Sequence, residues 1–106
     1  MSKAELVSFE PATGAELWRG RHGDVDEIIA SARRAWPAWA AQPLATRMEL
    51  MRRFANEVRK DAEKLATMIS RETGKPLWEA RTEVESVINK VEISIRAYAD
   101  RTSQRK

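Results

Sequence analysis

Few residues of this 106-residue chain have the types and spacing that catalysis, metal binding or cofactor binding requires. It has one histidine, His22, which lies in a charged, glycine-flanked segment, and it has no cysteine. A thiol nucleophile, a thiolate zinc site and a disulfide framework are therefore excluded within these residues. No serine or threonine is accompanied by the histidine and carboxylate partners of a catalytic triad. The residues by themselves predict no catalytic group, no metal ligand and no cofactor-binding position.

Gly74 and Lys75 invite comparison with a phosphate-binding loop. Such a loop needs a glycine five positions before the Gly-Lys pair and a serine or threonine after it. Position 69 is Ile and position 76 is Pro, so the requirement is not met. The segment instead predicts the end of a helix, because glycine adopts the left-handed conformation easily and Pro76 cannot continue a helix.

The composition and net charge of the chain limit the classes of molecule that it could bind. Apolar residues make up 42% of the chain, charged residues make up 33%, and the formal net charge is +3. Basic residues alternate with acidic ones, as where Arg52 and Arg53 lie between Glu49 and Glu57, which indicates solvated helix faces. No segment approaches the roughly 18 apolar residues of a membrane span. We therefore expect a cytoplasmic protein that binds neither nucleic acid nor a membrane.

The sequence predicts a β-hairpin followed by about four amphipathic helices, and these elements must position the residues described above. Residues 1–23 predict the hairpin, because the short apolar runs Leu6–Phe9 and Ala15–Trp18 flank a Pro-Ala-Thr-Gly turn. Residues 24–101 carry apolar residues at helical spacing, and residues 102–106 predict a frayed polar tail. The predicted fold class is mostly α, in a single domain over residues 1–106.

Capping residues and prolines predict where the helices begin and end. Pro37 interrupts the first helical pattern and predicts a kink or an end near Trp36. The last helix, from about Leu77 to Asp100, has a heptad-like apolar stripe that suits either the core face of a bundle or a coiled-coil seam. The stripe consists of Leu77, Val84, Val87, Ile88, Val91, Ile95 and Tyr98. Three helix starts are expected at capping residues: Asp24 with Glu27, Thr46 with Glu49, and Asp61.

Three stretches, in this order, resemble the N-terminal region of the aldehyde dehydrogenase superfamily. Residues 10–14, Glu-Pro-Ala-Thr-Gly, look like the family's Asn-Pro-Ala-Thr-Gly turn, with Glu10 in place of the usual Asn. Residues 32–39 look like its first helix, and residues 72–76 are its Glu-Thr-Gly-Lys-Pro segment unchanged. Residues 77–98 are similar to the succinylglutamate-semialdehyde dehydrogenase branch. The resemblance implies the N-terminal part of an α/β fold, so the domain is expected to be incomplete.

The resemblance implies a full-length enzyme that oxidises an aldehyde to a carboxylate with NAD, within arginine catabolism. The family's nucleophilic cysteine, its glutamate base and its nicotinamide-binding segments lie downstream of the matched region. We therefore expect no cofactor in these residues and no activity from the chain alone. In the family, the long helix runs near the substrate entrance, and an anionic succinyl group would suit a lysine there. The candidate entrance positions are Glu83, Ser86, Asn89 and Lys90.

Two functional hypotheses stay open. In the first, the chain is a dehydrogenase fragment whose helices present apolar faces that other domains cover. Exposed apolar patches are rarely left open, so we expect binding to the remainder of the dehydrogenase or self-association. Self-association would use the Leu77–Tyr98 stripe or exchanged helices. In the second hypothesis, the chain is a stand-alone helical protein-interaction module with a dehydrogenase-derived fold.

Overall fold

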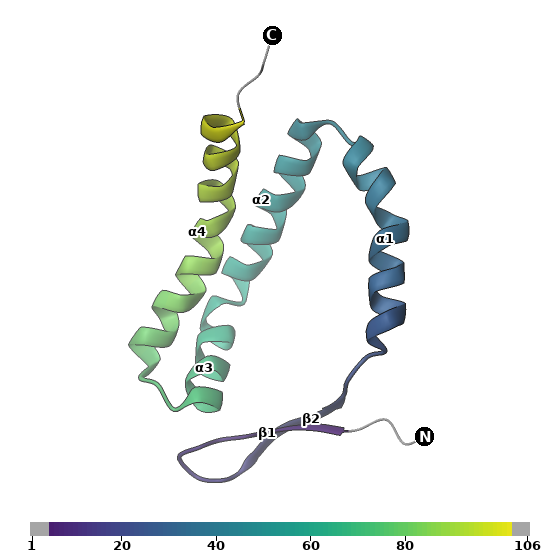
Figure 1. Ribbon diagram of the computed structural model, residues 1–106. Coiled ribbons are helices and arrows are strands. Elements are labelled where there is room, and N and C mark those ends of the chain that lie inside the picture. Colours follow the sequence, from purple (N-terminus) through teal and green to yellow (C-terminus); the bar gives the residue numbers. More distant parts are fainter. Residues whose placement is uncertain (1–4, 103–106) are drawn as a thin grey trace.

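The computed structural model describes residues 5–102 and consists of a two-stranded hairpin followed by four helices (Figure 1). The predicted fold class, mostly α with an N-terminal hairpin, is confirmed. Thr102 is the C-cap of the last helix, and the rest of the predicted tail, residues 103–106, lies outside the described residues. The strands are β1 (Glu5–Phe9) and β2 (Glu16–Arg21), and the helices are α1 (Val25–Ala41), α2 (Leu44–Lys60), α3 (Ala62–Thr73) and α4 (Leu77–Arg101).

The hairpin pairs β1 and β2 in antiparallel register around the predicted turn. Gly14 has a φ of 75°, and its N–H donates to the Glu10 carbonyl oxygen at 2.8 Å. A left-handed conformation of this kind favours glycine. β2 is longer than predicted, because Gly20 pairs with Leu6 instead of interrupting the strand.

Helix α1 begins where its cap was predicted but does not end near Trp36. The Asp24 side chain accepts a hydrogen bond from the Glu27 N–H at 3.2 Å, as a capping residue does. The helix passes through Pro37 and continues to Ala41, so of the two predicted outcomes the end near Trp36 is wrong, whereas the kink stays a prediction. Three of the four residues after Pro37 are alanines, the strongest helix formers, and this favours continuation beyond the missing N–H donor.

The capping box predicted at Thr46 and Glu49 is wrong. Helix α2 begins two residues earlier, at Leu44, with Pro43 as its N-cap and no side-chain capping bond. Proline needs no N–H partner at a helix start and has its φ already fixed, so Pro43 can precede the first turn without a capping side chain. The start predicted at Asp61 is confirmed in position, because α3 follows directly after that residue.

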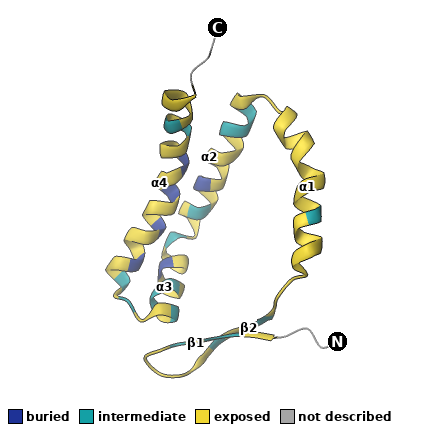
Figure 2. Cartoon of the chain, viewed as in Figure 1, coloured by how far each residue is buried: buried dark blue, intermediate teal, exposed yellow. Residues whose placement is uncertain are grey.

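The core is small and lies between α2, α3 and α4 (Figure 2). In the apolar stripe of α4, Val84, Ile88 and Val91 are buried, and Leu77 and Ile95 pack against them. The stripe is therefore mainly the core face of this bundle. Its remaining members, Val87 and Tyr98, stay half exposed. The buried residues are Ala55, Ala66, Ala80, Val84, Ile88 and Val91.

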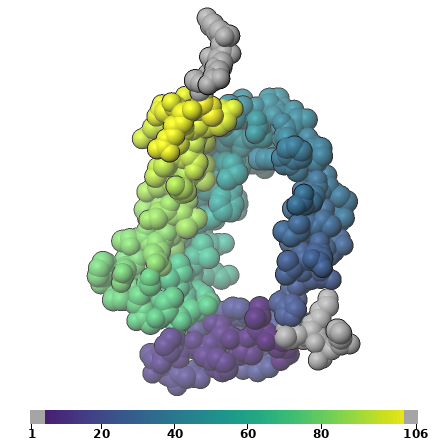
Figure 3. Space-filling view, viewed as in Figure 1, coloured from purple at the N-terminus to yellow at the C-terminus, as the bar shows by residue number. Residues whose placement is uncertain are grey.

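Helix α1 stands away from this bundle. It buries no residue, and Figure 3 shows an opening bordered by α1, α2, α3 and the hairpin. Four large apolar side chains on α1 are therefore left without a covering surface by residues 5–102; they are Val25, Ile28, Ile29 and Trp36. Within the same residues, no helix is both long enough and apolar enough to cross a membrane.

Ile88→Ala should destabilise the bundle by about 2–5 kcal/mol, the usual loss for truncating a buried isoleucine. The physical reason is that Ile88 is only 3% exposed, whereas Ile93 on the same helix is 50% exposed. Ile93→Ala is the matched control and should change stability by less than about 1 kcal/mol. Urea unfolding followed by far-UV circular dichroism measures both. Equal losses would contradict this placement of the core.

Candidate functional site

The carboxylate of Glu72 joins the hairpin to the C-terminal end of α3. Ser8 Oγ on β1 donates to Glu72 Oε2 at 3.0 Å, and Trp18 Nε1 on β2 donates to Glu72 Oε1 at 2.9 Å. Ser8 and Trp18 lie opposite each other in the hairpin. One side chain therefore holds both strands. The sequence motifs at residues 10–14 and 72–76, far apart along the chain, meet at this junction.

A second contact at the junction is ionic. Arg71 Nε donates to Glu10 Oε2 at 2.7 Å, and Thr13 Oγ1 donates to Glu10 Oε1 at 2.8 Å. The hydrogen bond from Arg71, followed by that from Thr13, lowers the pKa of the Glu10 carboxyl below its ordinary value. Glu10 thus gives the turn a negative charge that pairs with α3. The sequence shows that Glu10 is an unusual residue in the turn, but it does not indicate that Arg71 is the partner of this carboxylate.

The connection between α3 and α4 has the predicted glycine stop. Gly74 has a φ of 78°, and its N–H donates to the Ser70 carbonyl oxygen at 2.9 Å. A Cβ at Gly74 would lie 3.9 Å from Pro11, so the connection touches the hairpin turn. Ser70 Oγ donates to the Lys75 carbonyl oxygen at 2.7 Å, and Lys75 Nζ pairs with Glu83. These bonds fix the start of α4 against α3 and the hairpin.

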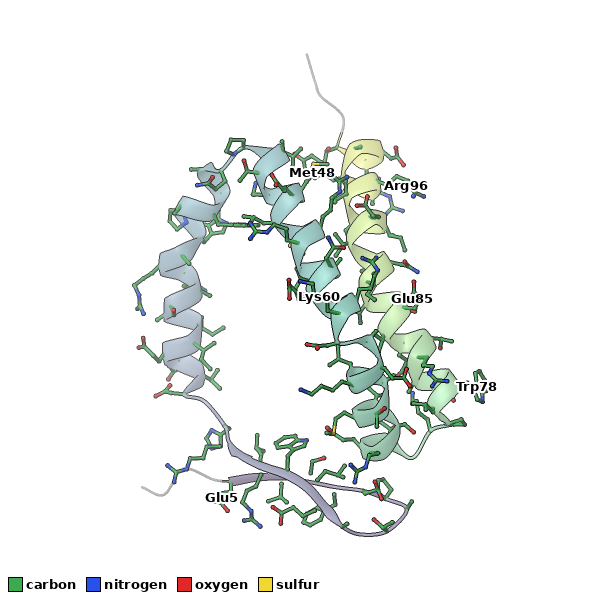
Figure 4. All side chains as sticks on the ribbon, turned by 180° about the vertical axis from the view of Figure 1, so that it is seen from behind. Glu5, Met48, Lys60, Trp78, Glu85 and Arg96 are labelled. Atoms are coloured by element: carbon green, nitrogen blue, oxygen red, sulfur yellow. The ribbon has the colours of Figure 1, made fainter. Side chains whose placement is uncertain are left out.

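An open apolar groove of about 440 Å³ runs between α2 and α4. Met48, which lines this groove, lies on α2 beside α4 in Figure 4. Two cationic side chains, Arg47 and Lys90, are also part of the lining. Apolar residues on both helices could be predicted from the sequence. Which of them remain exposed depends on how the two helices pack. The other apolar members are Trp39, Leu44, Met51, Phe54, Val87, Val91, Ile95 and Tyr98.

All four predicted entrance residues are exposed on α4, and Glu83, Ser86 and Lys90 lie along one face of this helix because they are three and four residues apart. Glu83 is engaged in the ion pair with the residue after Gly74, and Ser86 Oγ donates to the Thr82 carbonyl oxygen at 2.9 Å. Asn89 precedes Lys90 and therefore points about 100° away from it around the helix. Lys90 is the one member of the set that lines the groove.

Two further ion pairs connect one helix to another. Arg52 on α2 pairs with Glu92 on α4 at 2.6 Å, and Arg81 on α4 pairs with Glu63 on α3 at 2.6 Å. Each guanidinium lowers the pKa of its partner carboxyl through the hydrogen bond that it donates. In residues 5–102, no group of three or more His, Asp or Glu side chains is placed to hold a metal ion. The described side chains form a docked hairpin and an open groove.

Comparison with known proteins matches the whole chain to one family. The Aldehyde dehydrogenase family model matches residues 1–106. A protein of Novosphingobium aromaticivorans named N-succinylglutamate 5-semialdehyde dehydrogenase is 84% identical over 106 residues, which are 100% of this chain and 22% of that protein. Proteins of the same name from Sphingopyxis alaskensis and Burkholderia mallei are 63% identical over 102 residues and 50% identical over 104 residues. These matches cover 96% and 95% of this chain. The chain spans about a fifth of the length of these relatives.

Docking of the hairpin should weaken in acid. Because the pKa of Glu10 is lowered in the folded chain, its stabilising contribution is fully present above the unfolded value of about 4.3 and is lost as pH falls through the folded value. Glu10→Gln should therefore flatten this part of the pH dependence. Hydrogen exchange of the Trp18 indole N–H, measured by NMR between about pH 3 and pH 6, reports the docking.

The matched control is Glu57→Gln, which removes a carboxylate paired with Lys60 inside α2. That variant should keep the acid dependence of the Trp18 signal. Identical pH curves for the parent chain and Glu10→Gln would show that the Glu10 carboxylate does not hold the hairpin.

Proposed function

Because the chain belongs to the aldehyde dehydrogenase family, we propose that it is the N-terminal part of an N-succinylglutamate 5-semialdehyde dehydrogenase. The observation that carries the proposal is the 84% identity, along the whole chain, to the Novosphingobium protein of that name. The complete enzyme would oxidise N-succinylglutamate semialdehyde to N-succinylglutamate with NAD, as a step of arginine catabolism. We place that enzyme in the cytoplasm, the compartment that the composition predicted.

In this proposal, residues 1–106 supply scaffold and not a reacting group. Thiolate attack on the aldehyde needs a cysteine, and the chain has none. NAD, held by the rest of the polypeptide, would accept the hydride. The chain is then a single incomplete domain, with the hairpin in residues 1–23 and the helical segment in residues 24–101. Alone, it is expected to be inactive.

We propose that the polar residues of α4 lie near the substrate entrance, and that Lys90 contributes most. Its side chain reaches the groove, and none of the ion pairs found within residues 5–102 includes it. A free ammonium group can attract the anionic succinyl group of the substrate. Glu83 and Ser86 are engaged in bonds of their own, and Asn89 faces another direction, so they are weaker candidates.

We also propose that the isolated chain associates with itself through α1. The apolar side chains of this helix are exposed, with Trp36 at 66% and Val25 at 69%. Patches of this kind mark interaction surfaces. The Leu77–Tyr98 stripe is less available, because Val84, Ile88 and Val91 already lie in the core.

A chimera tests the proposed activity. Residues 1–106 replace the matched segment of the Novosphingobium relative, and NADH formation from N-succinylglutamate semialdehyde is measured. We expect kcat/KM within about tenfold of that relative, since tenfold corresponds to only ~1.4 kcal/mol of transition-state stabilisation.

The 106-residue chain alone is the negative control and should form no NADH. A folded chimera that oxidises other aldehydes but not this one would contradict the proposal. Co-purification of the chain with a stoichiometric partner unrelated to dehydrogenases would favour the stand-alone interaction module.

Lys90→Met in this chimera should raise KM for N-succinylglutamate semialdehyde by about fivefold, the equivalent of ~1 kcal/mol for a solvent-screened charge pair. The kcat should change little, because the ammonium attracts the succinyl end and not the reacting carbonyl. KM for an uncharged aldehyde should stay constant. Lys64→Met, at an exposed position on α3, is the control. Equal KM values for Lys90→Met and the parent chimera would show that Lys90 does not contribute to the substrate entrance.

A further inference from the structure

We infer that the apolar side chains of the groove between α2 and α4 form the surface on which the remainder of the dehydrogenase packs, while Lys90 at the same groove is left to the substrate entrance. The inference rests on the proposed function, because it takes the chain as one part of a longer enzyme. Beyond the proposed function, it identifies the face of the bundle that contacts the rest of that enzyme.

The groove has the character of an unfinished core. Its walls carry large apolar side chains that are half exposed, among them Phe54, Val87 and Tyr98 at 50%, 49% and 50%. Val91 and Ile95 continue from the groove directly into the buried core of the bundle. The other side of α4 differs, since the labelled charged side chains Glu85 and Arg96 point away from α2 (Figure 4). An apolar surface that continues into a buried core is a surface on which another part of the protein packs.

The position of the groove along the chain favours the remainder of the enzyme as its occupant. Tyr98 lines the groove from the last turn of α4, which ends at Arg101. The matched segment makes up 22% of the Novosphingobium relative and is its N-terminal part. In such a relative, most of the polypeptide therefore follows from a point within about one helical turn of the groove.

A second copy of the chain fits the groove poorly. A two-fold contact places the same patch of both copies together, so that one concave surface would face another. The two cations of the lining, Arg47 and Lys90, would then face copies of themselves. Like charges brought together in an interface oppose association. Within residues 5–102, the ion pairs include neither residue, so no carboxylate there offsets the repulsion.

Hydroxyl-radical footprinting of the 106-residue chain and of the chimera tests the inference directly. Met51, Phe54 and Tyr98 are the reporters, because oxidation of these side chains follows their exposure. We expect each to react severalfold less in the chimera than in the isolated chain. In the isolated chain, their reactivity should not change with concentration, whereas that of Trp36 on α1 should fall as copies associate.

A pair of variants gives an independent readout. Phe54→Asp places a charge in the groove, and Arg53→Asp places the same residue next to it, on the face shared with Asn56 and Lys60. Both positions are exposed in the 106-residue chain, so both variants should keep its circular dichroism spectrum. In the chimera, Phe54→Asp should lower the melting temperature by several degrees and Arg53→Asp should not.

The outcomes separate the inference from the proposed function. Protected reporters in the chimera support the inference, whether or not the chimera is active; an inactive chimera with a protected groove would count only against the proposed activity. Unprotected reporters in an active chimera would overturn the inference and leave the proposed function intact. Protection that appears in the isolated chain and grows with its concentration would assign the groove to a second copy, and would also overturn the inference.

Discussion

The position of the hairpin depends above all on the carboxylate of Glu72, with the Glu10–Arg71 ion pair beside it. The Glu72 carboxylate accepts hydrogen bonds from Ser8 on one strand and Trp18 on the other, at the end of a helix. A two-stranded hairpin is marginally stable alone, and no described hairpin residue is buried. Its docking therefore relies on polar contacts and not on a shared core. Because the hairpin leads into α1, this contact also anchors the N-terminal side of α1 to the end of α3.

The apolar residues are distributed in an unusual way for a folded domain. Three of the six buried residues are alanines, while all four tryptophans are exposed. Burial of large apolar side chains is the main source of stability, so a chain that keeps them outside has surfaces still to be covered. This agrees with a chain that spans about a fifth of its relatives. Within residues 5–102, the groove and α1 are two of the places where that covering is missing, and Trp18 on the hairpin and Trp78 at the start of α4 are exposed as well.

Local rules predicted the hairpin, the four helices and the stop at Gly74, because each depends on a few neighbouring residues. They failed where two local preferences compete, at Pro37 within an alanine-rich helix and at Pro43 before a capping sequence. The contacts of Glu72 were beyond sequence reasoning, since its hairpin partners are 54 and 64 residues away. The groove was missed because helix packing decides which apolar residues stay open. The entrance role of Lys90 stays a prediction.

The most direct measurement is the NMR signal of the Trp18 indole N–H in Glu72→Ala, with Glu79→Ala as the control on the exposed side of α4. If Glu72 holds the hairpin, its removal shifts this signal upfield and speeds its hydrogen exchange by about tenfold or more, as expected when a hydrogen bond to a charged group is lost. Helical circular dichroism and the Glu79→Ala signal should match the parent chain. An unchanged Trp18 signal in Glu72→Ala would contradict the central role of this carboxylate.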